Sequence, residues 1–588
     1  MDIAVLIKQV PVSNNVSVDP ETHALIRASA EGMINPADLN AIEEAMVLKE
    51  QTGGKVVVFT MGPPDAEKAL REAMAHGCDE SCLITDRVVA GGDTIATARV
   101  LAEAIKKYGH FDLILGGALS ADGATGQVGA MVAECLGIPH ICEIQSIQYD
   151  EAAPDKIEAV KKVYGERFRV RVSLPAVISV NFGCNVPRLA TLRSTRAAKS
   201  KPLTTYTNAD LELPEDQVGI KGSPTTVIDS FEPTGGRIAE MIEGTPEELD
   251  SETKRSDRGG ERKFIMANGI CIFAENYNGK LEPASAELVS AARRIQETTK
   301  EEISALVVAE SCDGIIEELK GIGVEKIYAI KTDHDLLLQD DAASQMIADM
   351  LKKIDPSSVL IPATPTGRSL FSRVAMKLNC GLTADCTELL VGAKEDGTYY
   401  IKQNKPSYGE NVFVTIITRE GYYPQMMTVR PGVYMVPEQT EGQAEVIYMD
   451  DIQAPVSQVE VVEILPQEES TDSILSSEIV VVGGRGALED DNFTLVKEFA
   501  DKIGAAIGGT RPMVDTGTIP FDHQIGQTGL TIRPKICISL GVSGAIQHTE
   551  GIKDTKLFVA VNTDENAAIF KVCDYGIQAD LREVLETT

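Results

Sequence analysis

Residues 304–330 read SALVVAESCDGIIEELKGIGVEKIYAI, and this stretch decides the fold. It predicts an apolar strand over Ser304–Val308, a helix, and a second strand over Ile327–Ile330. Two strands joined by one helix are typical of a right-handed βαβ unit with parallel strands. The same order occurs earlier, from the strand Lys55–Thr60 through a helix to the strand Cys82–Ile84. The sequence therefore predicts an α/β protein that contains this arrangement twice.

The two copies keep an almost constant distance along the chain. Gly77 and Gly323 begin equivalent turns, and Val132 and Val374 begin equivalent helical segments. A chance likeness between two βαβ folds is the alternative, but a fixed period favours duplication of one domain. We expect two doubly wound (Rossmann-like) parallel-sheet domains of the same kind.

A smaller α/β unit follows them, starting with the strand Glu478–Val482. Glu243–Gly260 (EGTPEELDSETKRSDRGG) is polar and lacks apolar periodicity, as is typical of a linker, and a weaker linker is expected over 453–476. The predicted organisation is a nucleotide-binding domain over 1–205, an arm and linker over 206–262, a second domain over 263–455, and a C-terminal domain over 475–588.

Composition excludes several classes of protein. The 588 residues carry a formal charge of −33, which repels nucleic acid. No apolar run approaches the ~20 residues of a membrane-spanning helix, and Lys8 comes too early for a secretory signal. The eleven cysteines form no C-x-x-C pair, so neither a disulfide framework nor a metal site is expected. We expect a cytoplasmic protein with no transmembrane segment and no metal.

Two glycine turns mark the C-terminal unit as a nucleotide site. Apolar strands run directly into Gly483–Gly486 and into Gly541–Ile546. Such turns present N–H groups to an anion at the carboxyl edge of a parallel sheet. Arg485 and Arg511 lie near them in the sequence. The second turn is not the G-x-S-x-G elbow of hydrolases, because Ser543 lacks that spacing.

A third glycine-rich loop follows the strand Leu113–Gly117. It spans Gly116–Gly129 and precedes a helix over Ala130–Leu136. Backbone N–H groups and the Thr125 hydroxyl could hold a phosphate there. A long flexible loop without a ligand is the alternative.

These motifs resemble the electron-transfer flavoprotein family, with the small and large subunits fused in one chain. Gly508–Arg511, Gln524–Gly529, Gly541–His548 and Asp574–Gly576 are similar to the FAD domain of the large subunit. Other segments resemble the first domain of that subunit, namely Ala363–Arg368, Gly381–Asp385 and Pro424–Gly432. Residues 1–205 resemble the small subunit, through Asn35-Pro36, Ala41–Glu50, Met61–Pro63, the 116–129 loop and Leu174–Val177. The resemblance covers nearly the whole chain apart from the linkers.

The resemblance implies an FAD site in the C-terminal unit. Arg511 would lie against the isoalloxazine, Thr528 near its N5, and His548 by the N1/O2 edge, where a cation or strong donor stabilises a reduced flavin. The implied cofactor-binding residues are Arg485, Thr510, Arg511, Ile525, Gly526, Gln527, Thr528, Ser543, Gly544, Ala545, Ile546, Gln547, His548, Asn562, Asp580 and Leu581.

The resemblance also implies a second nucleotide in the first domain. Simple members hold AMP there, whereas electron-bifurcating members hold a second FAD and receive electrons from NADH. The loop is closer to the bifurcating type but has Ala124 where an Asp is usual, so two FAD per chain are expected, with AMP as the alternative. The implied residues are Leu6, Asn35, Pro36, Met61, Gly116, Asp122, Gly123, Thr125, Gly126, Gln127 and Val128.

The implied function is electron transfer through FAD, as the redox subunit of an oxidoreductase system. Electrons would pass between NADH or a dehydrogenase and a partner such as an acyl-CoA dehydrogenase. Leu192 aligns with the anchor of the family's partner-recognition loop, although Val186 departs from the family pattern. The alternatives are a single-FAD carrier with structural AMP and a nucleotide-binding scaffold without redox work.

Overall fold

The computed structural model places two compact units, Met1–Leu465 and Pro466–Thr588. It describes residues 1–11, 17–18, 25–26, 32–231, 269–332, 338–394, 398–407, 412–440, 442–466, 474, 477–489, 492–520, 523–526, 529–530, 532, 534–549, 551–552 and 555–587. The predicted linker Glu243–Gly260 lies outside these residues. The predicted domain boundaries remain a prediction.

The first half of the larger unit contains a parallel sheet of seven strands. Its order is β13 (Leu203–Tyr206), β7 (Glu80–Ile84), β6 (Val56–Met61), β1 (Ile3–Leu6), β8 (Leu113–Gly117), β12 (Ala176–Val180) and β9 (His140–Gln148). β10 (Lys156–Val163) and β11 (Glu166–Ser173) continue the sheet in antiparallel fashion. β6 contains the continuous buried apolar run VVVF, which is typical of a parallel strand that packs against other elements on both faces.

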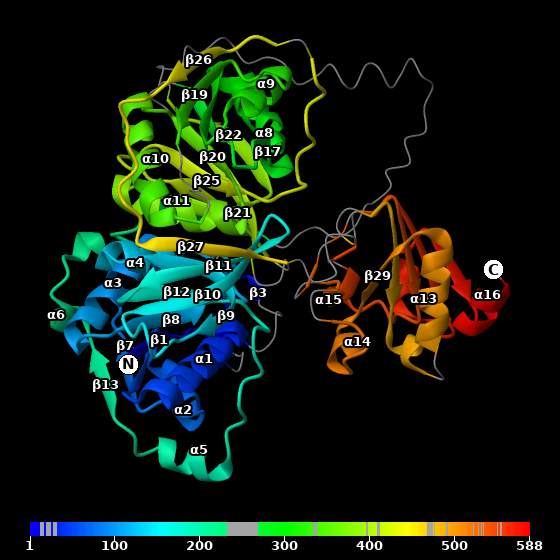
Figure 1. Ribbon diagram of the computed structural model, residues 1–588, viewed down its shortest axis with the longest axis horizontal. Coiled ribbons are helices and arrows are strands. Elements are labelled where there is room, and N and C mark those ends of the chain that lie inside the picture. The colour runs from blue at the N-terminus through cyan, green and yellow to red at the C-terminus, as the bar shows by residue number, and fades with distance from the viewer. Residues whose placement is uncertain are drawn as a thin grey trace. The chain divides into compact units, whose positions relative to one another are not determined.

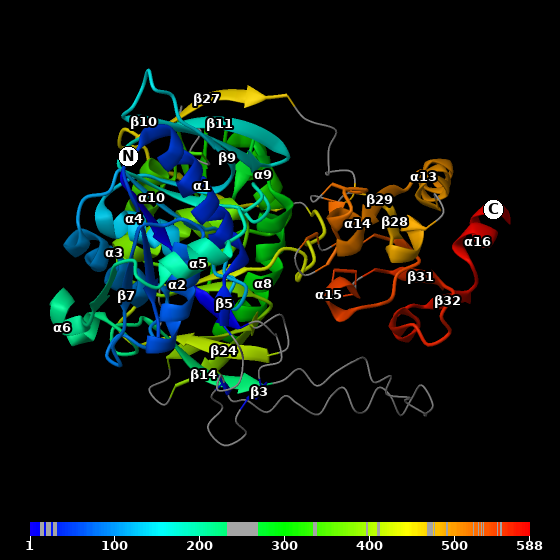
Figure 2. The ribbon, with the colours of Figure 1, turned by 90° about the horizontal axis from the view of Figure 1, so that it is seen from below.

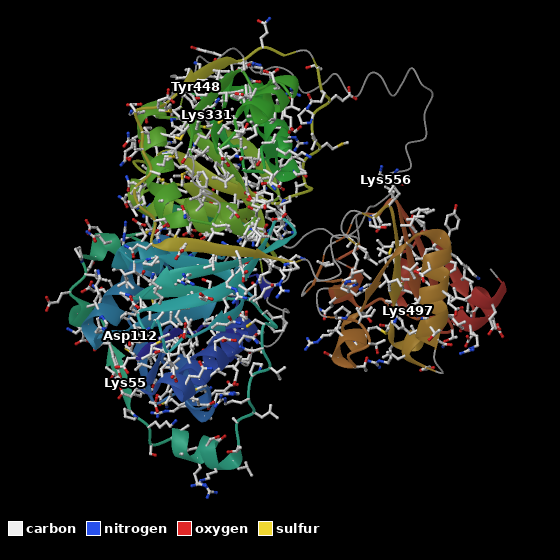
Figure 3. The ribbon with its side chains drawn as sticks, viewed as in Figure 1. Lys55, Asp112, Lys331, Tyr448, Lys497 and Lys556 are labelled. Atoms are coloured by element: carbon white, nitrogen blue, oxygen red, sulfur yellow. The ribbon has the colours of Figure 1, made fainter. Side chains whose placement is uncertain are left out.

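The second half repeats this order. Its parallel sheet runs β26 (Glu445–Tyr448), β19 (Lys326–Lys331), β18 (Ile303–Ala309), β15 (Ile270–Phe273), β20 (Ser358–Pro362), β25 (Gln425–Val429) and β21 (Leu382–Cys386). At its edge Lys331 and Tyr448 point toward one another, with the ammonium nitrogen 5.6 Å from the ring centroid (Figure 3). The predicted duplication and fold class are confirmed.

The two halves exchange one strand each. β14 (Thr225–Phe231), at the end of the first half, pairs with β24 (Val412–Thr418) of the second (Figure 2). β27 (Val459–Leu465), at the end of the second half, pairs with β11 of the first (Figure 1). β22 (Glu388–Ala393) and β23 (Tyr399–Ser407) complete the second antiparallel sheet. The expectation of a linker throughout 453–476 is therefore wrong for 459–465, because these residues complete a sheet.

Helices cover the parallel sheets on both faces. Those of the first half are α1 (Pro36–Thr52), α2 (Glu67–Ala75), α3 (Thr94–Tyr108) and α4 (Val128–Leu136), and those of the second are α8 (Pro283–Thr299), α9 (Asp313–Gly321), α10 (Asp340–Ile354) and α11 (Pro365–Leu378). Apolar residues of α3, α4, α10 and α11 belong to one core that spans both halves. The Arg373 guanidinium of α11 also pairs with Glu134 of α4 at 2.9 Å. The halves therefore fold as one body.

The smaller unit is a five-stranded parallel sheet. Its order is β29 (Ala506–Gly509), β28 (Ile479–Gly483), β30 (Ile536–Leu540), β31 (Leu557–Asn562) and β32 (Tyr575–Gln578). α13 (Asn492–Ile503) and α16 (Leu581–Thr587) lie on one face. This architecture agrees with the predicted small α/β domain.

All eleven cysteines are free thiols, most of them buried. Among the described residues no helix combines the length and the apolar character needed to cross a membrane. In the same residues no cluster of His, Cys, Asp and Glu is arranged to hold a metal ion.

Candidate functional site

The two glycine turns of the smaller unit pack backbone against backbone. The Gly484 N–H donates to Leu540 O at 2.9 Å, and the Gly486 N–H donates to Gly541 O at 3.2 Å. A Cβ on Gly484 would lie 2.2 Å from Gly541 O, so no larger residue fits there. The turns of two neighbouring strands therefore form one continuous backbone surface at the carboxyl edge of the sheet.

The predicted FAD residues gather around this edge. Arg485, Arg511, Ser543, Ala545 and Asp580 are exposed, whereas Thr510, Ile525, Gly526, Gly544, His548 and Leu581 are buried and Asn562 is half-buried. Gln527 and Thr528 lie outside the described residues, as do the side chains of Ile546 and Gln547.

Thr510 and Arg511 begin a short helix, α14 (Arg511–Asp515), at the end of β29. The Thr510 N–H donates to Gly483 O at 3.0 Å, which fixes α14 beside the first glycine turn. The Arg511 side chain is exposed, and its ion-pair contact with Asp515 is long, at 3.7 Å. An exposed guanidinium held only loosely is free to meet an anionic or aromatic ligand.

Asn562 holds the second glycine turn in place. Its Nδ2 donates to Val542 O at 2.8 Å, while its Oδ1 accepts from the Asp564 N–H at 2.9 Å. Asp580 accepts from the Arg582 N–H at 2.8 Å and thereby caps α16. Both side chains therefore have a structural role in the protein itself.

His548 lies in α15 (Ile546–Thr549) and has one ring nitrogen without a partner. Its Nδ1 is 2.9 Å from Ile525 O, which can only accept, so Nδ1 carries the proton. Its Nε2 is buried and has no hydrogen-bond partner among the described residues. Burial lowers the pKa of His548, although the bond to Ile525 opposes this. A buried polar atom without a partner is costly, so a ligand atom at Nε2 would stabilise the site.

The loop of the first half, residues 118–127, lies between β8 and α4. Asn35, before α1, shapes it: the Asn35 amide donates to Leu119 O at 2.9 Å and accepts from the Ala121 N–H at 3.0 Å. Asp38 lies beneath, and its carboxylate accepts from the backbone N–H groups of Lys8 and Gly117. Burial raises the pKa of Asp38 to about 7, against the effect of these bonds.

The other predicted residues of this site meet at the same edge. Leu6 and Met61 end the adjacent strands β1 and β6, and Gly116 is the last residue but one of β8. Pro36 and Val128 begin α1 and α4. Asp122 pairs with Lys8 at 2.7 Å, and these contacts lower the pKa of Asp122 despite its burial. Gln127 is buried, accepts from Thr94 and donates to Leu382 O.

The loop leaves part of its backbone available. Among the described residues the N–H groups of Thr125, Gly126 and Gln127 have no hydrogen-bond acceptor. They precede α4, whose positive end favours an anion. Gly126 has φ +64°, and a Cβ on Gly129 would lie 2.6 Å from Ser179 Oγ. The chain's own packing thus explains these two glycines.

Leu192 is the first residue of α5 (Leu192–Ala198) and directly follows an exposed apolar loop. Val186, Leu189 and Leu192 are 90%, 89% and 92% exposed. Arg188 clamps the loop to α1, through two 2.9 Å bonds from its side chain to the Glu43 carboxylate and one of 2.7 Å to Glu50. The loop therefore presents three apolar side chains from a fixed backbone.

Sequence reasoning missed Lys8, Asp38 and the Arg188 clamp. Each acts through a partner far away in the chain. For Asp38 a signal existed, because it follows Asn35-Pro36 by one helical turn and a carboxylate near a helix start often accepts N–H groups.

Comparison with known families agrees with this geometry. The model named "Electron transfer flavoprotein domain" matches residues 22–211 and 270–454. The model named "Electron transfer flavoprotein FAD-binding domain" matches residues 473–553. Because these matches cover most of the sequence, the chain belongs to the electron-transfer flavoprotein family, and it contains the FAD-binding domain of that family.

Curated relatives correspond to both subunits. The alpha subunit of the electron transfer flavoprotein of Thermoanaerobacterium thermosaccharolyticum is 35% identical over 320 residues, 54% of this chain and 95% of the relative. The beta subunit of the same organism is 40% identical over 249 residues, 42% of this chain and 94% of the relative. Subunit LctC of the lactate dehydrogenase (NAD(+),ferredoxin) of Acetobacterium woodii is 33% identical over 54% of this chain and 76% of the relative. These matches are consistent with a fusion of the two subunits.

Proposed function

We propose that this electron-transfer flavoprotein holds one FAD in its smaller unit and a second FAD at the loop of its first half. The observation that carries the C-terminal assignment is the buried Nε2 of His548, which has no partner among the described residues. The glycine turns lie at the carboxyl edge of the sheet, and those of their N–H groups that do not donate to backbone carbonyls would bind the phosphates. The residues that would hold this FAD are Arg485, Thr510, Arg511, Ile525–Thr528, Ser543–His548, Asn562, Asp580 and Leu581.

FAD supplies the ring that accepts and returns electrons, and the protein's residues hold and tune it. Nδ1 of His548 donates to Ile525 O, so Nε2 of the neutral ring carries a lone pair. Negative charge next to Nε2 raises the pKa of His548, and the histidine then takes up a proton at that atom. The imidazolium stabilises the negative charge, as does the guanidinium of Arg511.

The second FAD would rest on the loop 118–127. In support, the N–H groups of Thr125, Gly126 and Gln127 lack acceptors among the described residues. A Cβ on Gly123 would make only ordinary van der Waals contact, with Ser120 Oγ at 3.8 Å. Leu6, Asn35, Pro36, Met61, Gly116, Asp122, Gly123, Thr125, Gly126, Gln127 and Val128 would form the site. AMP in place of this FAD is the second candidate, since Ala124 removes the carboxylate usual in two-FAD members.

Two flavins in one chain allow electrons from NADH to divide between two acceptors, and we propose such bifurcation here. One relative is named as a subunit of a lactate dehydrogenase that uses NAD(+) and ferredoxin, which supports this assignment. The partner would be an oxidoreductase such as an acyl-CoA dehydrogenase. It would dock on the exposed loop around Leu192. We place the reaction in the cytoplasm.

Cofactor stoichiometry tests this proposal. The purified full-length chain is denatured, and the released FAD and AMP are separated by chromatography and quantified. We expect two FAD per chain and loss of the flavin absorbance when NADH is added. One FAD and one AMP per chain, with no reduction by NADH, would contradict the second FAD and support a carrier with a single flavin. A colourless chain that takes up no FAD would support a non-redox scaffold instead.

A further inference from the structure

Two basic side chains of the second half, Arg368 and Lys405, contact the loop 118–127. They belong to a group of four cations that also contains Arg430 of the second half and Lys161 of the first. They share two acidic neighbours. Asp385 interacts with Arg368, Lys405 and Arg430, and Glu143 interacts with Arg368 and Lys161. Around Asp385 three cations therefore face one carboxylate, although the whole chain carries a charge of −33. A buried excess of positive charge is unfavourable unless an anion compensates it.

Arg368 is the member of the cluster that is not satisfied. Arg430 forms an ion pair with the Asp385 carboxylate at 2.6 Å, whereas the guanidinium of Arg368 lies 3.7 Å from the same carboxylate. The Nε of Arg368 is buried and has no hydrogen-bond partner among the described residues. The Arg368 side chain is 16% exposed. Its charge is therefore largely shielded from water, and its ion-pair contact with Asp385 is long.

Arg368 also lies directly against the glycine loop. Its Cδ is 3.4 Å from the position of a Cβ on Gly126, so the glycine leaves the space that the arginine side chain occupies. Gly126 is one of the three residues whose N–H groups have no acceptor among the described residues. The unsatisfied cation and the unsatisfied N–H donors thus occur at the same place. Both require an anion.

Lys405 ties the loop to the second half. Its buried ammonium donates to Gly123 O at 2.8 Å, and Ser407 donates to Asp122 O at 3.3 Å. Burial lowers the pKa of Lys405, and Asp385 opposes that effect. Because a residue from the second half fixes the carbonyl of Gly123, the shape of the loop depends on both halves.

We propose that the nucleotide site of the first half is composite, and that Arg368 of the second half supplies the positive charge that balances a phosphate of the bound nucleotide. Lys405 acts as a positioning residue that holds the loop. The inference rests on the proposed second nucleotide and adds a binding residue from the other half of the chain. Phosphate is common to FAD and AMP, so the assignment of Arg368 applies to either ligand.

The test uses the full-length chain stripped of nucleotide and titrated separately with FAD and with AMP. We expect Arg368→Gln to weaken binding of both at the first-half site by about tenfold or more, and Arg368→Lys to restore part of it. The FAD of the smaller unit serves as an internal control and should stay bound in all variants. Arg294→Gln is the matched control, because Arg294 is an exposed cation of the second half beside Tyr434.

Asp385→Asn separates a binding role from a structural one. It removes the acidic neighbour of Arg368 without removing positive charge, so we expect FAD and AMP to bind at least as tightly as in the unmodified chain. Equal affinity of Arg368→Gln and the unmodified chain would overturn the inference, as would equal weakening by Asp385→Asn. Circular dichroism checks the fold of each variant. If the unmodified chain binds neither FAD nor AMP at this site, the proposed second nucleotide fails as well, so the two failures are distinguishable.

Discussion

The two halves of the larger unit have the same strand order but present different residues at the carboxyl ends of their strands. After β1 comes Lys8, whereas after β15 comes Glu275. In the first half Lys8 pairs with Asp122 of an open glycine loop. In the second half Glu275 is fully buried and accepts from Thr364 at 2.6 Å and from Tyr164, a residue of the first half.

This difference shows how one duplicated fold can have one open and one closed strand-end position. Tyr164 follows β10 of the first half and stacks on Tyr277 of the second, with the ring centroids 5.0 Å apart. Between β8 and α4 the first half has residues 118–127, but between β20 and α11 the second half has only 363–364. The fold provides two equivalent positions, and loop length and side chains decide which one can hold a ligand.

The largest expected effect comes from closing the open position. An ideal Cβ on Gly123 lies 3.8 Å from its nearest neighbour, so the protein itself tolerates a Cβ there. We expect Gly123→Leu to fold but to lose the nucleotide of the first half, while FAD remains in the smaller unit. Chromatography of the released nucleotides measures this. Gly123→Ala is the size control and should keep both. Retention of both nucleotides by Gly123→Leu would show that the loop is not the site.

A second difference concerns the loops that follow β12 and β25. The first-half loop exposes Leu189 and Leu192, whereas the second-half loop exposes Met435 and continues with the polar segment 438–440. If the first loop docks the partner, Leu192→Ala should lower kcat/KM for electron transfer with an acyl-CoA dehydrogenase by about tenfold. The flavin potentials should not change.

Met435→Ala gives the matched control, since Met435 is 85% exposed on the other half. It should transfer electrons at the rate of the unmodified chain. An equal loss in both variants, or no loss in Leu192→Ala, would contradict docking through the first-half loop.

The repeat, the parallel sheets and the glycine turns could be predicted from the sequence because each is a local pattern. The strand exchange could not be predicted, because the sequences of β14 and β27 do not indicate the distant strands with which they pair. The same limit applies to Arg368 and to the contact of Tyr164 with Glu275, both of which depend on how the halves meet.

Two buried histidines show the same contrast between a satisfied and an unsatisfied group. His140 contacts Ser369 through Nδ1 at 3.1 Å and Ser179 through Nε2 at 2.8 Å, so it has a structural role. His548 leaves Nε2 without a partner among the described residues.

We expect His548→Ala and Arg511→Ala to keep the fold but lower the first flavin potential. A hydrogen bond to a charged group is worth roughly 1.5–3 kcal/mol, or about 65–130 mV for one electron.

Spectroelectrochemical titration of the FAD in the smaller unit measures this shift. His523→Ala is the control, because His523 bonds to Ile507 O through Nδ1 in the same unit and is not a predicted flavin contact. Potentials unchanged within error in both the His548 and the Arg511 variants would place these residues away from the ring.

The smallest expected effect concerns stability. Burial raises the pKa of Glu275 from 4.5 to about 7, although the hydroxyls of Thr364 and Tyr164 oppose the shift and Glu282 adds to it. Between pH 4.5 and 7 the unfolded chain loses this proton and the folded chain keeps it, so stability falls as pH rises and levels off above 7. The contribution is about 3 kcal/mol, equivalent to about 3 °C in Tm for a unit of this size.

Asp38 in the first half titrates in the same range, so Glu275→Gln should remove only part of the fall in Tm between pH 5 and 8. Calorimetry at four pH values measures it, with Asp38→Asn as the counterpart from the other half. If Tm falls with pH as steeply in Glu275→Gln as in the unmodified chain, the Glu275 carboxylate is ionised in the folded protein. Tyr164 would then close this position by packing alone.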